Sequence, residues 1–127
     1  MISVAATDAS ATLPAATLDL GAQTISALNS NAATFADGPS YPVVVLGSPE
    51  NVSPGCDAAD YARPDVRGAL VVTLRGVCDR WVRAELGQAA GAAAVALLNA
   101  DPGYPPFEGE IARVCVAASR SITSSAV

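Results

Sequence analysis

The chain has 127 residues, of which 51% are hydrophobic and 15% charged, with 12 acidic residues against 7 basic ones and no histidine. This length fits one domain with a hydrophobic core of its own. Every basic residue is an arginine. Without histidine the chain cannot assemble a Ser-His-Asp triad, a Cys-His dyad or a histidine-bearing zinc site, and without lysine it cannot form a Schiff base. The composition therefore predicts a domain that binds, positions or covers something.

The charge balance excludes two classes of partner. The net charge is -5, and the arginines are dispersed along the chain, so no cationic patch for nucleic acid or for an anionic membrane surface is expected. The longest apolar stretches, residues 42–46 and 89–98, fall short of the roughly 20 residues that span a bilayer. The N-terminus has neither the basic region nor the apolar region of a signal peptide.

In the first half of the chain the apolar residues alternate as they do in strands. Residues 17–20 and 24–28 show a period of two, which predicts two half-buried strands. A turn at residues 37–39 leads into a β-branched strand at 41–47. Residues 47–68 are rich in Pro, Gly, Asp and Asn and are predicted to form an ordered loop.

The second half predicts a βαβ unit. Residues 68–76 form a continuous apolar run, the pattern of a strand buried on both faces. Asp79 is expected to cap a helix by accepting a backbone N–H bond, and Gly91 to end that helix in the left-handed conformation. A second apolar strand follows at residues 92–99. The two strands are expected to be parallel and the crossover right-handed.

One face of the predicted helix is apolar. The residues at helical spacing on that face are Val82, Leu86, Ala89 and Ala90, and those placed elsewhere are Arg80, Arg83, Ala84 and Gln88. The glycines at both ends of residues 87–91 indicate close packing, since a phosphate-binding loop would need a lysine and would lie at the start of a helix. Residues 101–110 are expected to form a loop, 111–116 a last strand, and 117–127 an unpatterned, fraying tail.

The three cysteines do not form a C-x-x-C pair. Cys56 and Cys78 stand at the two ends of a turn-rich segment, so a disulfide between them would close a loop of about 20 residues and contribute about 3 kcal/mol. The alternative is three buried free thiols, with Cys115 as the third. A disulfide requires an oxidising compartment, which agrees with the lack of a signal peptide only if this chain is an internal piece of a longer secreted protein.

Several segments of the chain, in the right order, resemble a protease-associated (PA) domain. The most recognisable run is Arg-Gly-x-Cys at residues 75–78, then a helix, then Ala-Gly-Ala-Ala before an apolar strand. The other segments that carry the resemblance are 55–61, 66–72 and 98–99. Phe-Glu-Gly at 107–109 and the opening at residues 2–6 further resemble PA domains inserted in secreted bacterial subtilisin-like serine peptidases.

The resemblance implies an α/β fold, namely a three-layer β/β/α swivelling domain that is rich in strands and has one main helix. It supports the pairing of Cys56 with Cys78. It divides the chain into residues 1–12, similar to the end of a subtilisin-like catalytic-domain strand, a PA domain at 13–116, and a Ser-rich tail at 117–127. Neither the tail nor Cys115 matches the family pattern.

The candidate contact site is an aromatic and proline-rich cluster on the 101–110 loop. If exposed, it would contact a peptide or an adjoining catalytic domain, and the alternative is a hydrophobic plug over the barrel end. The residues of this cluster are Tyr104, Pro105, Pro106, Phe107 and Glu108.

Three other groups of residues have simpler interpretations. Cys78 as a phosphatase nucleophile would need an arginine at position 84, where the chain has alanine. Arg75 and Arg80 flank the Cys78 turn and are expected to orient the loop or pair with nearby acids. The acids Asp101, Glu108 and Glu110 have oxygen ligands suited to calcium but not the spacing of an EF-hand, so no cofactor or metal is expected.

The sequence therefore predicts a non-catalytic PA domain, a fragment of a secreted subtilisin-like serine endopeptidase, that binds or positions polypeptide substrate or limits access to the active site. Its expected partners are the catalytic domain of the parent peptidase and polypeptide substrates. Its expected location is extracellular or at the cell surface, through a signal peptide not present in this chain. The alternatives are an insert of a zinc aminopeptidase, a free-standing secreted interaction module and a small enzyme that uses Cys78.

Overall fold

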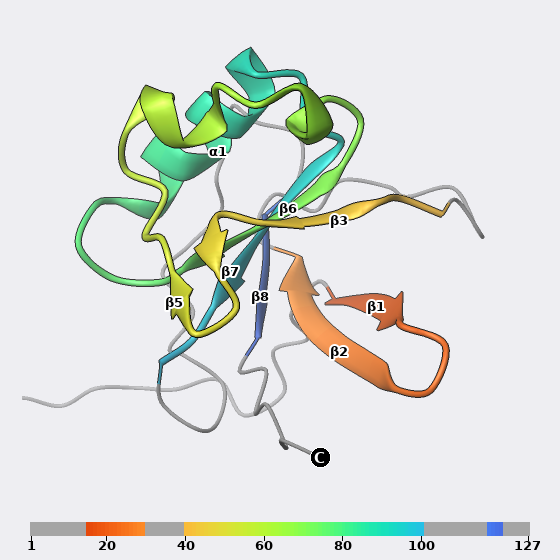
Figure 1. Cartoon of the computed structure of the whole chain (residues 1–127). Helices are drawn as coiled ribbons and strands as arrows, with labels where there is room; N and C mark the ends of the chain where they lie inside the picture. The colour runs from red at the N-terminus through yellow and green to blue at the C-terminus, as the bar shows by residue number, and fades with distance from the viewer. Residues whose placement is uncertain (1–14, 30–39, 101–116, 121–127) are drawn as a thin grey trace, which may run out of the picture.

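A computed structural model describes residues 15–29, 40–100 and 117–120, and within them a six-stranded mixed sheet is the dominant element (Figure 1). The strand order is β1-β2-β8-β7-β6-β3. The strands of this sheet are β1 (Ala15–Asp19), β2 (Thr24–Asn29), β3 (Val43–Val45), β6 (Leu70–Leu74), β7 (Ala94–Leu98) and β8 (Ala117–Arg120). Strands β3, β6, β7 and β8 are parallel to one another, whereas β2 runs antiparallel to both β1 and β8.

The remaining elements lie between the strands in the chain. The main helix, α1 (Arg80–Ala89), joins β6 to β7, so the predicted βαβ unit with parallel strands is confirmed. The turn-rich segment 47–68 is ordered, as expected. It contains a short hairpin of β4 (Gly47–Ser48) and β5 (Asn51–Val52) and the 3-10 helices η1 (Ala58–Tyr61) and η2 (Pro64–Val66).

Strands β6 and β7 are buried on both faces, as their continuous apolar sequence predicted. Toward α1, Val71 and Val95 belong to a cluster that also contains Tyr61 of η1 and the packed Leu86 of the helix. Alternate residues of the same two strands form a second cluster on the other face, against which Leu18 of β1 packs. In Figure 1, α1 and the 3-10 helices lie above the parallel strands and the β1–β2 hairpin lies below them. The α/β fold of the PA type, with strands dominating over one main helix, is confirmed.

Helix α1 buries a different face from the one its apolar residues predicted. The buried residues are Arg83, Ala84 and Gly87, and Ala89 is exposed. The prediction placed Arg83 and Ala84 away from the core because it followed only the helical spacing that starts at Val82. The buried face instead uses small residues, which let the helix approach the sheet closely. It also uses one arginine whose guanidinium bonds to backbone carbonyls.

The expectation of a fraying tail is wrong for β8. Residues 117–120 form a strand inserted between β2 and β7, so the backbone pairs on both sides. Backbone pairing of this kind does not require an apolar pattern, which is why the sequence pattern did not indicate it. The expected loop at 101–110 and strand at 111–116 lie outside the described residues. Within the described ranges, no helix is long and apolar enough to cross a bilayer.

Candidate functional site

A pocket of about 400 Å³ lies where the parallel strands β6 and β7 end and helix α1 begins. Its position follows from the topology, because the loops that leave the carboxyl ends of neighbouring parallel strands meet at one edge of the sheet. Its volume is within the range of ligand-binding pockets. The lining residues that the structure describes are Arg75, Gly76, Cys78, Asp79, Arg80, Trp81, Arg83, Asn99 and Ala100.

A disulfide fixes one wall of the pocket. The Sγ atoms of Cys56 and Cys78 are bonded and their Cα atoms are 5.9 Å apart, the pairing expected from the sequence. The bond joins the turn-rich segment before η1 to the loop between β6 and α1, across a sequence separation of 22. Because Cys78 is in a disulfide, it offers no thiolate for nucleophilic catalysis.

The buried guanidinium of Arg83 makes a second tie between the same two loops. Arg83 is 1% exposed, its Nε donates to the carbonyl oxygen of Pro54 at 2.6 Å, and its Nη2 donates to the carbonyl oxygen of Gly76. One acceptor lies two residues before Cys56 and the other two residues before Cys78. Helix α1 and both loops are therefore held in one arrangement.

Tyr61 supports this arrangement from inside the core. Its hydroxyl donates to the carbonyl oxygen of Gly55 at 3.0 Å and lies 3.4 Å from that of Arg83. Burial raises the pKa of Tyr61 to about 12, and Arg83 opposes that shift. Gly55 has φ +62, and a Cβ there would lie 2.7 Å from both the Tyr61 hydroxyl and the Thr73 methyl group. Only glycine fits this position.

Arg75 stands at the carboxyl end of β6 and is aligned with the end of β7. Its backbone N–H donates to the carbonyl oxygen of Leu98 at 2.7 Å, and its Nη1 donates to Asn99 Oδ1 at 3.3 Å. These bonds agree with the expected role of Arg75 in orienting the loop. They also hold its side chain on the wall of the pocket.

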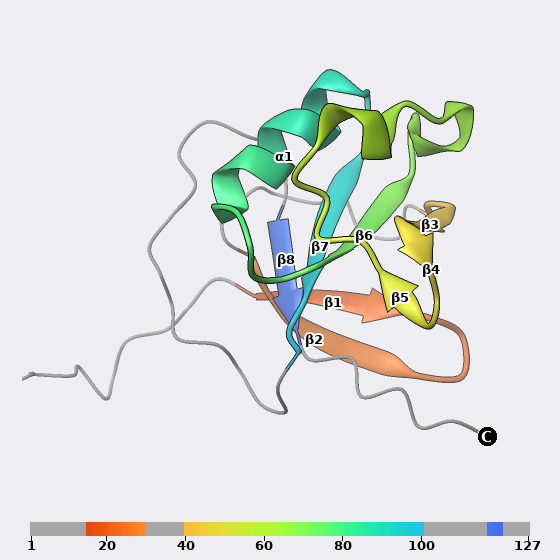
Figure 2. The same ribbon diagram turned by 60° about the vertical axis from the view of Figure 1, so that its left-hand side comes forward.

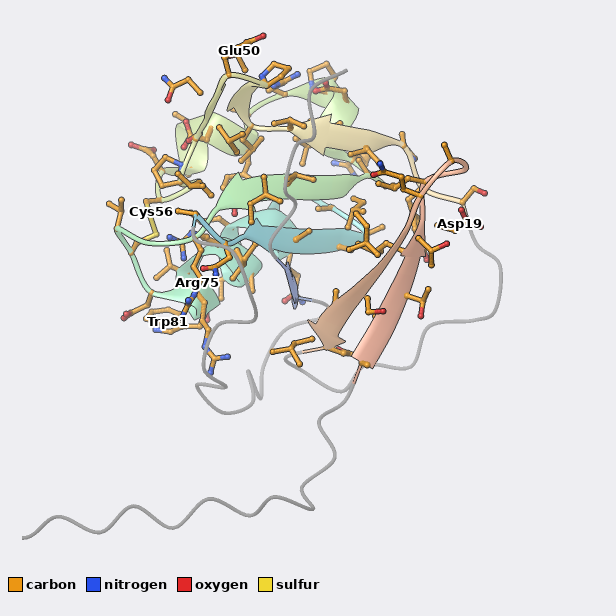
Figure 3. The ribbon with its side chains drawn as sticks, turned by 90° about the horizontal axis from the view of Figure 1, so that it is seen from below. Asp19, Glu50, Cys56, Arg75 and Trp81 are labelled. Atoms are coloured by element: carbon orange, nitrogen blue, oxygen red, sulfur yellow. A yellow bond between two sulfur atoms is a disulfide. The ribbon has the colours of Figure 1, made fainter. Side chains whose placement is uncertain are left out.

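The entrance to α1 differs from the predicted cap. Asp79 occupies the N-cap position, but its side chain makes no capping bond to the backbone. Asp79 Oδ2 instead accepts a hydrogen bond from Trp81 Nε1 at 3.2 Å. The prediction considered only backbone donors, whereas the indole two residues later competes for the same carboxylate. Trp81 stays 49% exposed and is held in a defined orientation beside Arg75 (Figure 3).

The turn before Cys78 is strained. The N–H of Cys78 donates to the carbonyl oxygen of Gly76 at 2.7 Å, which closes a three-residue turn around Val77. Val77 has φ 58 and is 91% exposed. A β-branched residue in the left-handed region is an outlier, and such outliers cluster at binding and catalytic sites.

Comparison with known proteins identifies the family. The PA domain family matches residues 39–123, more than half of the chain. The chain belongs to the PA domain family. It is also 40% identical over 84 residues to the "Probable lipoprotein aminopeptidase LpqL" of Mycobacterium tuberculosis (strain ATCC 25618 / H37Rv). That match covers 65% of this chain and 16% of the relative, so this PA domain corresponds to a small part of a much longer protein.

The structure brings together only some of the residues that the sequence singled out. Cys78, Arg75 and Arg80 all line the pocket. The proposed contact cluster of Tyr104, Pro105, Pro106, Phe107 and Glu108 lies outside the described residues. The candidate calcium ligands Asp101, Glu108 and Glu110 do as well. In the described part of this PA domain, no group of three or more His, Cys, Asp or Glu side chains could hold a metal ion.

Sequence reasoning missed the importance of three pocket residues. Arg83 was placed off the apolar face of the helix, although a guanidinium can be buried where backbone carbonyls accept its hydrogen bonds. Asn99 was treated as the end of a strand and as part of the family resemblance, but not as a pocket residue. Trp81 received no role, although it is the only tryptophan of the chain and precedes an apolar position at the start of a helix. A lone tryptophan at the start of the predicted helix was the available signal.

Proposed function

We propose that this PA domain is a non-catalytic module of a longer exported peptidase, where it binds or positions polypeptide substrate or limits access to the active site. The observation that carries the proposal is the pocket itself. It presents an exposed indole and arginine side chains, at the start of helix α1 and on the loop before it, beside the Cys56–Cys78 disulfide. Rigid aromatic and arginine side chains are enriched at recognition surfaces.

The name of the similar mycobacterial protein favours an aminopeptidase as the parent enzyme. A subtilisin-like serine endopeptidase is the second candidate, and it rests on the resemblance of residues 2–6 and 107–109. In either parent, the catalytic residues would belong to another part of the protein, and the catalytic domain would be the first partner of this module.

An exported location is the third part of the proposal. The disulfide between Cys56 and Cys78 is of the kind that persists in oxidising compartments. The similar protein is named a lipoprotein, which agrees with a position at the cell surface.

The proposal is tested in the full-length parent peptidase with the variant Trp81→Ala. Hydrolysis of an unfolded protein substrate should fall by about tenfold, the usual cost of losing one aromatic anchor, while hydrolysis of a short chromogenic substrate stays within about twofold. Leu20→Ala is the matched control, because Leu20 is 48% exposed on the β1–β2 turn. Equal losses on both substrates, or an equal effect of Leu20→Ala, would contradict the proposal.

A further inference from the structure

Strand β3 is an outer strand of the six-stranded sheet, and it pairs on one side only. It stands last in the strand order, and its residues 43–45 are in parallel register with residues 70–72 of β6. Figure 3 shows β3 (pale yellow) beyond β6 (pale green). The outer side of such a strand presents backbone groups that another chain can pair with.

The ladder bonds determine which backbone groups of β3 point outward. The N–H of Leu70 in β6 donates to the carbonyl oxygen of Pro42 at 2.9 Å. Alternate residues of a strand turn their backbone groups to the same side, so Pro42 and Val44 face β6, whereas Val43 and Val45 face away from it. Among the described residues, the N–H and the carbonyl of Val43 and the N–H of Val45 have no hydrogen-bond partner.

Arg63 closes one end of this edge. Its Nη1 donates to the carbonyl oxygen of Val45 at 3.4 Å, and its Nε and Nη2 donate to the carboxylate of Asp65. The open stretch therefore consists of three backbone groups, in the order donor, acceptor, donor. An extended polypeptide backbone offers acceptors and donors at the matching spacing.

The side chains at this edge are apolar and exposed. Val43 is 51% exposed and Tyr41 is 39% exposed. Val43 is on the same face of the strand as Val45, which packs against the second core cluster. A strand added beside β3 would place an alternate side chain next to Val43 and extend that cluster. The exposed side chains of the other outer strand, β1, are small or polar.

We infer that β3 accepts an extended polypeptide segment as an additional outer strand, with a β-branched or aromatic side chain of that segment against Val43 and Tyr41. This inference rests on the proposed function, and it specifies the substrate class as unfolded segments with alternating apolar residues. The surface is separate from the pocket, because neither residue is among the described residues that line it.

A single bound segment fits this edge better than a second copy of the chain. Three residues of strand bury far less than the roughly 1,200 Å² of a stable interface between folded proteins. Each copy also carries a net charge of -5, which opposes self-association. A single segment needs less area, because its affinity comes largely from backbone hydrogen bonds.

Amide hydrogen exchange in the 127-residue chain, followed by NMR, tests the pairing directly. In the free chain, the amide of Val44 should exchange more slowly than those of Val43 and Val45, because only Val44 donates to β6. The probe is a capped, net-neutral peptide that alternates threonine and valine between one lysine and one glutamate. Near saturation, exchange at Val43 and Val45 should slow about tenfold. The same peptide with its central residues N-methylated should leave both rates unchanged.

Variants of the two outer strands assign the effect to β3. Val43→Pro removes an outward N–H at the first residue of an edge strand, where proline is tolerated, and Val43→Lys places a charge on the edge. Each should weaken the peptide affinity, measured by NMR titration, about tenfold. Thr17→Lys makes the same charge change at an exposed position of β1 and should leave the affinity within about twofold. Melting curves identify a variant that fails to fold, and the other variant at position 43 then decides the test.

Four results would overturn the inference. Slow exchange of Val43 in the free chain at every concentration would show that the edge is already covered. Slowing that appears with chain concentration alone would assign the edge to a second copy. The other two results are equal binding of the N-methylated peptide and an equal effect of Thr17→Lys. All four are separable from failure of the proposed function, because Trp81→Ala in the parent peptidase tests that function at the pocket and leaves β3 unchanged.

Discussion

Replacing Gly87 by alanine tests how closely α1 approaches the sheet. A Cβ at Gly87 would lie 2.3 Å from Cγ2 of Val95, a buried side chain of the central strand β7. A contact this short requires Val95 or the helix to move by about an ångström, and overpacking of a close-packed core costs about 1–3 kcal/mol. Alanine would gain up to about 1 kcal/mol in helix propensity over glycine. The expected net effect is a destabilisation of about 1.5 kcal/mol.

The exposed neighbour Gln88 supplies the reference. The difference in free energy of unfolding between Gln88→Gly and Gln88→Ala measures helix propensity alone, and alanine should be the more stable by about 0.5–1 kcal/mol. At position 87 the glycine form should be more stable than the alanine form. Both pairs are measured by urea unfolding at constant m-value. In thermal melts, Gly87→Ala should lower Tm by roughly 5 °C.

A double variant then assigns the cost to Val95. Val95→Ala removes the methyl group that meets the new Cβ, so it should be less destabilising in the Gly87→Ala background than alone, with a coupling energy of about 1 kcal/mol. Two results would contradict this explanation. One is that alanine is more stable than glycine at position 87, as it is at position 88. The other is that the effects of Gly87→Ala and Val95→Ala on the free energy of unfolding are additive. Either result would show that the close approach of α1 to β7 is not the reason for glycine at position 87.

Three further predictions concern the residues that hold the pocket. Burial raises the pKa of Tyr61 from 10.0 to about 12 in the folded chain. The protonated Tyr61 therefore contributes about 2–3 kcal/mol to the free energy of unfolding below pH 10, and this contribution is lost as the pH rises toward 12. Urea unfolding across this pH range should show the loss in the unmutated 127-residue chain but not in Tyr61→Phe. If the free energy of unfolding falls equally with pH in both, the prediction is wrong. The double variant Cys56→Ser/Cys78→Ser should lower the free energy of unfolding by about 3 kcal/mol through the closed loop, and an unchanged urea midpoint would contradict this. Val77→Asn should raise stability by about 1 kcal/mol, since Val77 is exposed with φ 58 and asparagine tolerates that conformation; a lower Tm would show that the valine is not strained.

The strands and the crossover helix were predictable because their residues follow simple periods. The continuous apolar runs predicted β6 and β7 as strands buried on both faces, and the alternation at 17–20 and 24–28 predicted the strands β1 and β2, though not their pairing. The stop of α1 was also predictable, because Gly91 has φ +81 just beyond the helix. In each case one local property, hydrophobic spacing or backbone freedom, decides the structure.

The buried face of α1 was not predictable by the same reasoning. Hydrophobic spacing pointed to Ala89 as a core residue, yet Ala89 is exposed and Arg83 is buried. The reason is long-range, because one of the two carbonyl groups that satisfy Arg83 belongs to Pro54, which is 29 residues away in the sequence. Strand β8 is similar, since its pairing with β2 and β7 depends on the backbones of strands far away in the chain.

The pocket was the least predictable feature, although all its residues were visible in the sequence. Each of Arg75, Trp81 and Asn99 has an ordinary local interpretation, and their meaning depends on the parallel arrangement of β6 and β7, which brings the loops to one edge (Figure 2). The sequence did predict that arrangement. The polar and aromatic residues that follow each parallel strand were therefore the signal for the pocket.

The way in which this pocket is held bears on the proposed binding of polypeptide. Three independent ties converge on the loops around it, namely the Cys56–Cys78 disulfide, the two carbonyl bonds of Arg83 and the Tyr61 hydroxyl bond to Gly55. None of these groups supplies a free nucleophile or a base with a pKa near neutrality. Their common effect is to order the wall before a partner arrives, so that less conformational entropy is lost on association. If the module binds polypeptide as proposed, removal of one tie should weaken that binding even where the pocket residues themselves are unchanged.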